Sequence, residues 1–485
     1  MKTNKSTKLA LGLAVAALAA NGLHAQTAPA TTGGKLWGYA YADYSYMLNA
    51  DSAGRGNNIL YKGLGAASTK QTNPNAFDIR RAYLGYDYTI NDKFSATVLL
   101  AYEGDQDVNG NKTVFLKNAY FTWKNIFKGS NLMLGQQPTC SFATPYQTEA
   151  LYGYRSMDKT IMDMRKIDGS TDMAIGLGGS IWKAKADSGK MGTMIGYMVQ
   201  VGNNSGNSPI PGFDPTTGSL SGASITSTST STTTGTVVAI SPSTGKDTTL
   251  TVTSKTTTTT TTADSLNPFN GTTDKAKKIR ANLYVNALNG ALTVGAYTDY
   301  INYGNFYYGT AKGYNSNVMT VKGYVNYSSK WFGIGFEYFM QSKANAEYSY
   351  DPNSKATPIV HDTGSATQSG WSVFARGTIM PDKLNVFARV DGFNPDNNYS
   401  NTKMFTNTFV PANTYTEMFM SFGFDWTPTK DKKVHIEPNL WYDAISYQGV
   451  AAKNSSGVYV GDAGSGSLKS ANYMIARLTV HYIFK

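Results

Sequence analysis

A single cysteine, four histidines and a low charge content set the first limits on this chain of 485 residues. Cys140 has no second cysteine with which to form a disulfide, and cysteines and histidines are too few to predict a Cys/His zinc site. Only 15% of the residues are charged, and the net charge of +11 is not gathered into a nucleic-acid footprint. The sequence therefore predicts no metal, no cofactor and no nucleic-acid partner.

Long apolar runs are absent beyond the N-terminus, so no membrane-spanning helix is predicted there. Residues 1–25 have the pattern of a secretory signal peptide, in which lysines precede the apolar stretch 9–20 and a small-residue cleavage site ends at Ala25. We therefore expect the mature chain to begin at Gln26. An uncleaved anchor helix is the alternative.

Tyrosine and glycine are abundant, with 33 and 48 residues, and aromatic residues make up 13% of the chain. Apolar and polar residues alternate in many segments, as in strands whose successive side chains point to opposite faces. A membrane barrel combines this pattern with a low mean hydropathy, here −0.32, because only every other residue faces lipid. Sixteen strands are expected, at 34–47, 77–90, 93–103, 113–124, 130–137, 172–184, 190–202, 278–289, 290–301, 317–329, 330–343, 368–380, 383–393, 414–427, 433–447 and 471–484.

Short and long connections alternate between these segments. Asn289-Gly290 is a strong hairpin signal, and Asn91-Asp92 and Pro381-Asp382 close two further hairpins. Short periplasmic turns and long external loops are typical of bacterial outer-membrane barrels. The sequence therefore predicts an all-β, transmembrane antiparallel barrel over residues 26–485, in an outer membrane of the Gram-negative type. The long loops are expected at 48–76, 104–112, 138–171, 203–277, 302–316, 344–367, 394–413 and 448–470.

The loop 203–277 is dominated by serine, threonine and glycine, and residues 256–262 are all threonine. Such a segment has too few apolar residues to order itself by burial. It is predicted to be a mobile external loop. A rigid insert and an O-glycosylated stalk are the alternatives.

Strand parity separates charged from apolar side chains. In segment 77–90, Leu84 and Tyr86 share one face and Arg81 lies on the other. A charge facing lipid at mid-depth costs about 2–4 kcal/mol, so Arg81 is predicted to face the lumen. Arg80 has the opposite parity and is expected to reach the head-group zone. The same parity rule assigns six more bases to the pore: Lys278, Arg280, Lys322, Arg376, Arg389 and Arg477.

Two interpretations of these bases remain open. They predict either a ladder that draws anions through the pore or a mixed lumen in which each base pairs with an acid. The loop 138–171 carries further candidates, Arg155 and Lys159. This loop is predicted to fold inward and constrict the pore. It could instead cover the outside or latch onto a neighbouring subunit.

Three blocks of the sequence resemble the phosphate-selective porin O and P family. They are FDIRRAYLGYDYTINDKFSATVLLAYEG at 77–104, VFLKNAYFTWKNIFKGSNLMLGQ at 114–136 and FGFDWTPTKDKKVHIEPNLWYD at 422–443. The resemblance implies a 16-stranded porin, usually trimeric, whose third external loop constricts the channel. It also implies anion-binding roles for Arg81, Arg155 and Lys159. The family often has a basic residue before the proline that follows the second block, whereas here Gln137 precedes Pro138.

These observations favour a porin that passes small hydrophilic solutes by diffusion, with a preference for anions or phosphate, as a homotrimer in outer-membrane lipid. The alternative is a surface adhesin or structural barrel that acts through its Ser/Thr-rich loop. A third hypothesis is a barrel hydrolase with His435 or His481 as its base, but no nucleophile signature accompanies either histidine. The chain is therefore not predicted to be an enzyme.

Overall fold

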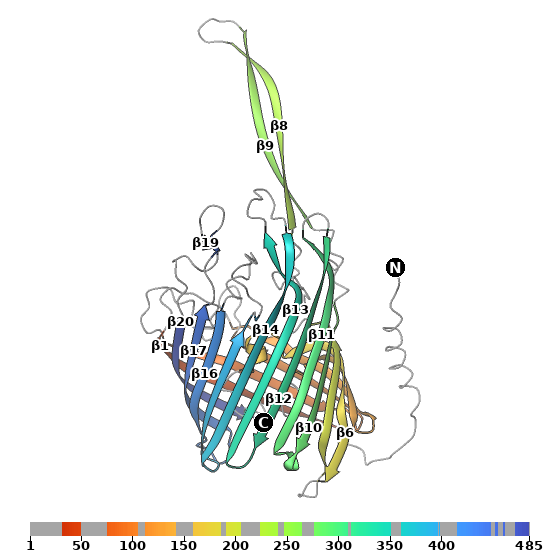
Figure 1. Cartoon of the computed structure of the whole chain (residues 1–485), viewed down its shortest axis with the longest axis vertical. Helices are drawn as coiled ribbons and strands as arrows, with labels where there is room; N and C mark the ends of the chain where they lie inside the picture. Colours follow the sequence, from red (N-terminus) through yellow and green to blue (C-terminus); the bar gives the residue numbers. More distant parts are fainter. Residues whose placement is uncertain are drawn as a thin grey trace.

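Sixteen antiparallel strands close into one barrel (Figure 1). The computed structural model describes residues 32–49, 75–104, 112–141, 159–185, 191–204, 224–240, 247–263, 276–308, 312–350, 360–395, 397, 415–447, 452–453, 459–460 and 471–484. In barrel order the strands are β1 (Gly33–Asn49), β2 (Asn75–Thr89), β3 (Phe94–Tyr102), β4 (Phe115–Phe127), β5 (Ser130–Pro138), β6 (Thr171–Lys185), β7 (Met191–Gly202), β10 (Lys278–Ala287), β11 (Leu292–Tyr308), β12 (Lys312–Ser328), β13 (Phe332–Tyr350), β14 (Val360–Met380), β15 (Leu384–Asn394), β16 (Tyr415–Trp426), β17 (Val434–Tyr447) and β20 (Ala471–Phe484).

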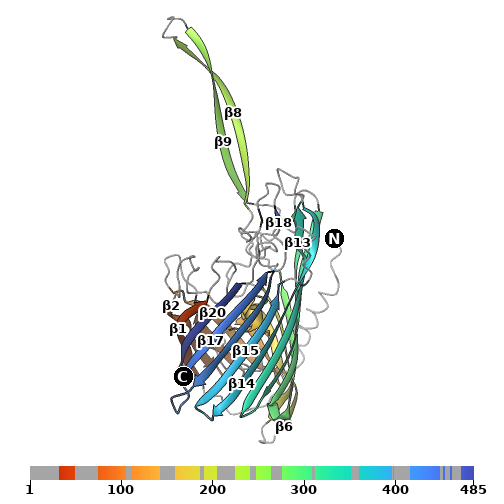
Figure 2. The ribbon, with the colours of Figure 1, turned by 60° about the vertical axis from the view of Figure 1, so that its left-hand side comes forward.

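The predicted fold class and strand number are confirmed, and each predicted segment overlaps one barrel strand. The predicted outer ends of β11 to β14 are too short, because the strands of the structure continue into the predicted loops 302–316 and 344–367. The pairing of β11 with β12 reaches Tyr308↔Lys312, so the first of these loops is wrong over most of its length. Tyrosine and phenylalanine are common at 303–308 and favour strand pairing. Figure 2 shows β13 rising above β17 and β20.

The wall of the barrel separates apolar side chains outside from polar side chains inside. On β10, Ile279 and Leu283 are 50% and 49% exposed and face outward, whereas Lys278 and Arg280 are 3% and 1% exposed and face inward. A one-residue slip would turn every charge of this strand toward lipid. The alternation therefore determines both the register of β10 and the face that lines the lumen.

A β-bulge in β2 interrupts this alternation. Tyr41 pairs with Arg81, but the next residue, Ala42, pairs with Ile79, so Arg80 is the extra residue of β2. Arg80 therefore faces inward like Arg81, and its Nε donates to Asp43 Oδ2 at 2.6 Å. The expectation that Arg80 reaches the head-group zone is wrong, because parity reasoning assumes an unbroken strand.

Short turns join the strands at one end of the barrel (Figure 1). Between β10 and β11 the turn η3 (Leu288–Gly290) places Asn289 and Gly290 at φ 57° and 90°. Asparagine and glycine tolerate this left-handed backbone, as the Asn-Gly hairpin signal predicted.

The remaining elements are not strands of the barrel wall. Strands β8 (Ser224–Ile240) and β9 (Asp247–Ala263) pair along their whole length as a hairpin within the predicted loop 203–277. The sequence argument predicted that this segment would not order itself, whereas its strands are paired, and threonine is enriched in strands. Its mobility stays a prediction. Strands β18 (Ala452–Lys453) and β19 (Tyr459–Val460) form a second small sheet, and α3 (Ile161–Met164) lies between β5 and β6. In the part of the chain described here, no helix is long and apolar enough to cross a membrane.

Candidate pore constriction

The described parts of the loop between β5 and β6 lie against the inner wall of the barrel. We call residues 139–141 and 159–170 the inward segment. Its apolar anchor is α3, where Ile161 and Met162 are fully buried and cluster with Phe339 of β13. A Cβ at Gly370 of β14 would lie 2.8 Å from Ile161 Cδ1, so glycine at this position allows the close approach.

Asp168 ties the inward segment to β10. Its carboxylate accepts hydrogen bonds from Lys278 Nζ at 2.9 Å and from Arg280 Nε and Nη2 at 3.0 and 2.9 Å. Ser141 Oγ and Tyr297 OH also donate to it, at 2.7 and 3.0 Å. Burial alone would raise the pKa of the Asp168 carboxyl, but the Arg280 guanidinium and the Lys278 ammonium hold it well below its usual range. Asp168 is therefore an ionised carboxylate in a dense polar network.

Further polar contacts tie the inward segment to three more strands. Lys322 of β12 donates to the Ser141 carbonyl at 3.1 Å, and Arg389 of β15 donates to the Lys159 carbonyl at 2.6 Å. Arg165 of the segment pairs with Glu417 of β16 at 2.6 Å. The segment is thus attached to the wall from β10 to β16.

These contacts locate three of the predicted pore-lining bases. Arg280 pairs with Asp168 and Asp172, Lys322 pairs with Glu337 at 3.4 Å, and Arg389 pairs with its strand neighbour Asp391 at 2.6 Å. All three bases face inward and have acidic partners close by.

Arg81 and Lys159 lie near a second acidic centre, Glu103, which follows β3. Lys117 and Lys159 form ion pairs with the Glu103 carboxylate, the latter at 3.6 Å, and Tyr83 OH donates to it. Burial would raise the pKa of Glu103, but Lys117, Lys159 and Arg81 lower it below its usual range. Lys159 also lies 3.8 Å from Asp163. Three bases and two acids therefore meet between β2, β4 and the inward segment.

Arg477 of β20 belongs to a third group, together with Arg80 and Asp43. Its Nε lies 3.8 Å from Asp43 Oδ2, and its guanidinium carbon lies 4.0 Å from the centre of the Trp441 ring. Arg80 lies 5.6 Å from the centres of both the Tyr41 and Trp441 rings. Two bases thus share one carboxylate on an aromatic surface, where the ring faces favour cations.

The last two predicted site residues lie elsewhere. Arg376 lies close to the short-turn end of the barrel, where its Nη2 donates to Ser328 Oγ at 2.6 Å. Arg155 lies outside the described residues. The predicted bases therefore do not form a single described cluster.

Sequence reasoning missed the role of Asp168 in the inward segment and the local role of Gln137 beside it. Asp168 was not singled out because the argument followed strand faces, and its partners lie over 100 positions away in the sequence. Gln137 was noted only as a departure from the family pattern, yet it is fully buried, and its Nε2 donates to the Ala174 carbonyl at 2.6 Å. Gln200 Nε2 in turn donates to Gln137 Oε1 at 3.2 Å. A neutral amide at position 137 therefore serves the local packing.

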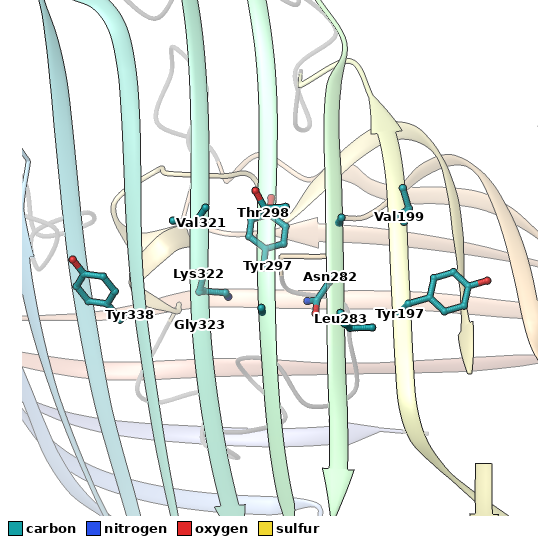
Figure 3. A pocket seen from close by; sticks show the side chains of 12 residues that line it. Tyr197, Val199, Asn282, Leu283, Tyr297, Thr298, Val321, Lys322, Gly323 and Tyr338 are labelled. Carbon is teal, nitrogen blue, oxygen red and sulfur yellow. The ribbon is translucent and has the colours of Figure 1, made fainter. Parts of the chain in front are cut away.

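A hollow of about 630 Å³ lies on the outer side of the wall, over the five adjacent strands β7, β10, β11, β12 and β13 (Figure 3). Small residues such as Ala281, Ala296 and Gly323 line it, together with the outward-facing Leu283 and Val321. This lining is apolar, so the hollow belongs to the lipid-facing surface and not to the solute path.

Comparisons with known proteins support the fold. No protein-family model and no curated protein sequence matches the chain. Among solved structures, the chain resembles the outer membrane channel DcaP of Acinetobacter baumannii at 10% identity, covering 95% of this chain and 100% of that one, with a TM-score of 0.53. An anion-selective porin from Comamonas acidovorans matches at 9% identity, covering 93% of this chain and 100% of that one, with a TM-score of 0.47. OprB of Pseudomonas putida matches at 12% identity, covering 93% and 94%, with a TM-score of 0.46.

At such low identity the likeness to DcaP establishes the fold alone. The closed 16-strand barrel, apolar outside and polar inside, is an outer-membrane β-barrel. Membership of the phosphate-selective porin O and P family stays a prediction.

Proposed function

We propose that this barrel is a porin through which small hydrophilic solutes diffuse passively. The observation that carries the proposal is the inward segment, which lies inside a barrel whose inner face is polar and is tied to the wall through Asp168, Arg165 and α3. A segment anchored in this way narrows the lumen without any chemistry. It would set the size limit for solutes, while the charges beside it would set the barrier for each ion sign.

We also propose a modest preference for anions. The group around Glu103 contains three bases and two acids, and the group around Asp43 contains two bases and one acid. Each group has an excess of one positive charge beside low-dielectric walls that focus its field into the lumen, which lowers the barrier for anions. In contrast, Lys278 and Arg280 face three carboxylates, including Asp172 and Asp299. The preference is therefore expected to depend on Arg81 and Lys159 more than on Arg280.

Liposome swelling tests passive diffusion. Proteoliposomes should swell in neutral sugars at rates that fall steeply with sugar size. Rates equal to those of protein-free liposomes, measured with folded protein, would contradict the porin.

Charge variants test the ion preference. Replacing Arg81 and Lys159 together with glutamine should shift the reversal potential toward that of a non-selective channel, whereas Lys330→Gln on an exposed turn should leave it unchanged. A preference for cations in the unmodified protein would remove the anion proposal. Recording in phosphate against chloride would decide whether the anion is phosphate, as the family resemblance implies.

We further propose that the porin assembles as a homotrimer, which the family resemblance implies. Light scattering of the detergent-solubilised protein measures the mass directly. A mass of three chains supports the trimer, and a mass of one chain contradicts it.

One observation favours a second function as a surface adhesin. The hairpin of β8 and β9 extends away from the barrel in both views (Figures 1 and 2). Deleting residues 205–275 and joining the ends with a short Gly/Ser linker separates the two functions. Loss of surface binding with unchanged conductance would favour the adhesin, whereas changed conductance would assign the hairpin a role in the channel.

A further inference from the structure

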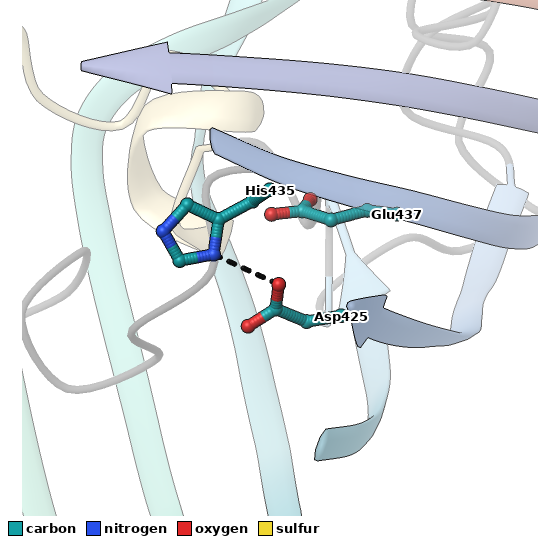
Figure 4. Close-up of side chains that lie close together, drawn as sticks. All are labelled: Asp425, His435 and Glu437. Atoms are coloured by element: carbon teal, nitrogen blue, oxygen red, sulfur yellow. Dashed lines mark hydrogen bonds and ion pairs between the residues drawn. The ribbon is translucent and has the colours of Figure 1, made fainter. Parts of the chain in front are cut away.

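We propose that Asp425, His435 and Glu437 form a binding site for a divalent transition-metal ion, with Zn²⁺ as the best fit, inside the barrel near its short-turn end. One ligand atom from each side chain lies within 4.8 Å of the other two. Figure 4 shows the two carboxylates and the imidazole turned toward one another from neighbouring strands. The existence of this site does not depend on the porin function.

The strands β16 and β17 bring these residues together across the turn 427–433. Their alternation turns Trp426 outward, 48% exposed, while Asp425 and Glu437 face inward and are 2% and 1% exposed. The pairing of the two strands stops at Gly423↔Asn439 and resumes at Trp426↔Ile436. Pro438 lies in this gap and has no N–H to donate to β16.

The orientation of the imidazole is the second observation. His435 Nε2 lies 3.2 Å from the carbonyl oxygen of Lys432, which can only accept a hydrogen bond. A neutral imidazole that donates from Nε2 has its lone pair on Nδ1, and Nδ1 points at Asp425 Oδ1 from 2.8 Å. A lone pair facing a carboxylate is unfavourable unless a positive charge lies between them. A metal-bound histidine commonly has this arrangement, with one nitrogen on the metal and the other donating to a backbone carbonyl.

The donor set favours Zn²⁺ over Ca²⁺ or Mg²⁺. One imidazole nitrogen and two carboxylates suit a borderline ion, whereas the hard cations prefer oxygen ligands alone. In a tetrahedral zinc site the ligand atoms lie about 3.3 Å apart. To bind zinc, His435 Nδ1 and Asp425 Oδ1 would have to move slightly apart from their distance of 2.8 Å. The ligand atoms that now lie farther apart, at most 4.8 Å, would have to move closer together. Rotation of the carboxylates is sufficient, and a water molecule would complete the coordination.

Two other arrangements compete with the metal. A doubly protonated imidazole would form an ion pair with Asp425 and need no metal. A hydrolase triad would need a hydroxyl at Nε2, opposite the acid. The hydroxyl of Thr427 instead lies 3.4 Å from Nδ1, on the same nitrogen as Asp425. The geometry therefore differs from that of a triad. A zinc titration distinguishes the metal site from the ion pair.

Zinc titration of the full barrel in detergent, stripped with a chelator and followed by calorimetry, tests the proposal. We expect one Zn²⁺ per chain at neutral pH. Asp425→Asn and His435→Gln should each weaken binding by at least about tenfold. Asp431→Asn, on the exposed turn beside the site, should bind like the unmodified protein. Equal binding by all four proteins, or no binding by the unmodified one, would overturn the site and leave the ion pair.

Two controls keep the result interpretable. His481, whose ring centre lies 5.2 Å from that of His435, is the other nearby imidazole. Loss of binding in His481→Gln with retention in His435→Gln would also overturn the assignment. If the ligand variants fail to fold, X-ray absorption of the zinc-loaded unmodified protein gives the answer. A shell of nitrogen and oxygen at about 2.0–2.1 Å with imidazole scattering supports the site, and its absence refutes it.

Discussion

Replacing Asp168 with asparagine should release the inward segment from β10 and widen the pore. The carboxylate accepts five hydrogen bonds, three of them from Lys278 and Arg280, at 2.7 to 3.0 Å. Asparagine has nearly the same shape, but it lacks the charge and would direct an NH₂ group at donors. The substitution therefore removes the charge without creating a cavity.

The magnitude follows from the burial of these groups. Removing one partner from a buried ion pair typically costs about 3–5 kcal/mol. Asp172 and Asp299 remain beside Arg280 and Lys278, at 2.8 and 3.2 Å, so we expect the lower end, about 3 kcal/mol. That energy changes the ratio of docked to released segment by about 100-fold, since about 1.4 kcal/mol is a factor of ten.

Hydrogen exchange across residues 159–170 and single-channel recording would measure this change. The variant should exchange these amides faster and show a larger or noisier conductance, while Asp382→Asn on an exposed turn should behave like the unmodified protein. The pKa of Asp168 is depressed, so its contribution is present above the usual carboxyl pKa of about 3.9 and is lost only as the pH falls through the lower, folded value. The unmodified segment should thus stay docked from about pH 8 to pH 5. Unchanged exchange and conductance in the variant would refute the role given to Asp168.

Three further predictions concern the wall and its surroundings. Burial raises the pKa of the Cys140 thiol to about 12, so at pH 8 maleimide should label the folded protein about a thousandfold more slowly than the unfolded chain, and equal rates would contradict the burial. Leu283→Arg turns a charge toward lipid and should lower the free energy of unfolding in liposomes by about 2–4 kcal/mol, measured by urea titration, whereas an unchanged value would place Leu283 away from lipid. Breaking the exposed pair of Asp382 and Lys432 with Lys432→Gln should leave the same titration curve unchanged, because exposed pairs are screened by water, and a clear destabilisation would contradict this.

The barrel could be predicted because its two strongest signals are local. Alternation with a period of two fixes which face of each strand meets lipid, as for Leu283 and Arg280, and Asn289-Gly290 marks a hairpin without reference to the rest of the chain. The outer end of β11 was missed because residues 303–308 do not alternate regularly between apolar and polar. The bulge at Arg80 also lacked a signal, since one extra residue leaves the composition unchanged.

The candidate site was less predictable because its contacts are long-range. The inward direction of Arg280 follows from parity, but its partner Asp168 lies 112 positions away in a loop. No pattern in a single sequence pairs two such residues. Only the paired strands reveal that Pro438 lies in the gap next to Asp425 and Glu437.

Recording single channels across a planar bilayer under a potassium chloride gradient tests the polar, water-filled lumen most directly. The folded protein should insert in discrete steps of conductance, and the reversal potential should have the sign of a mild anion preference. Folded protein that inserts without conducting would contradict an open pore. A reversal potential of the opposite sign would contradict the excess of positive charge around Glu103 and Asp43 as the selective element.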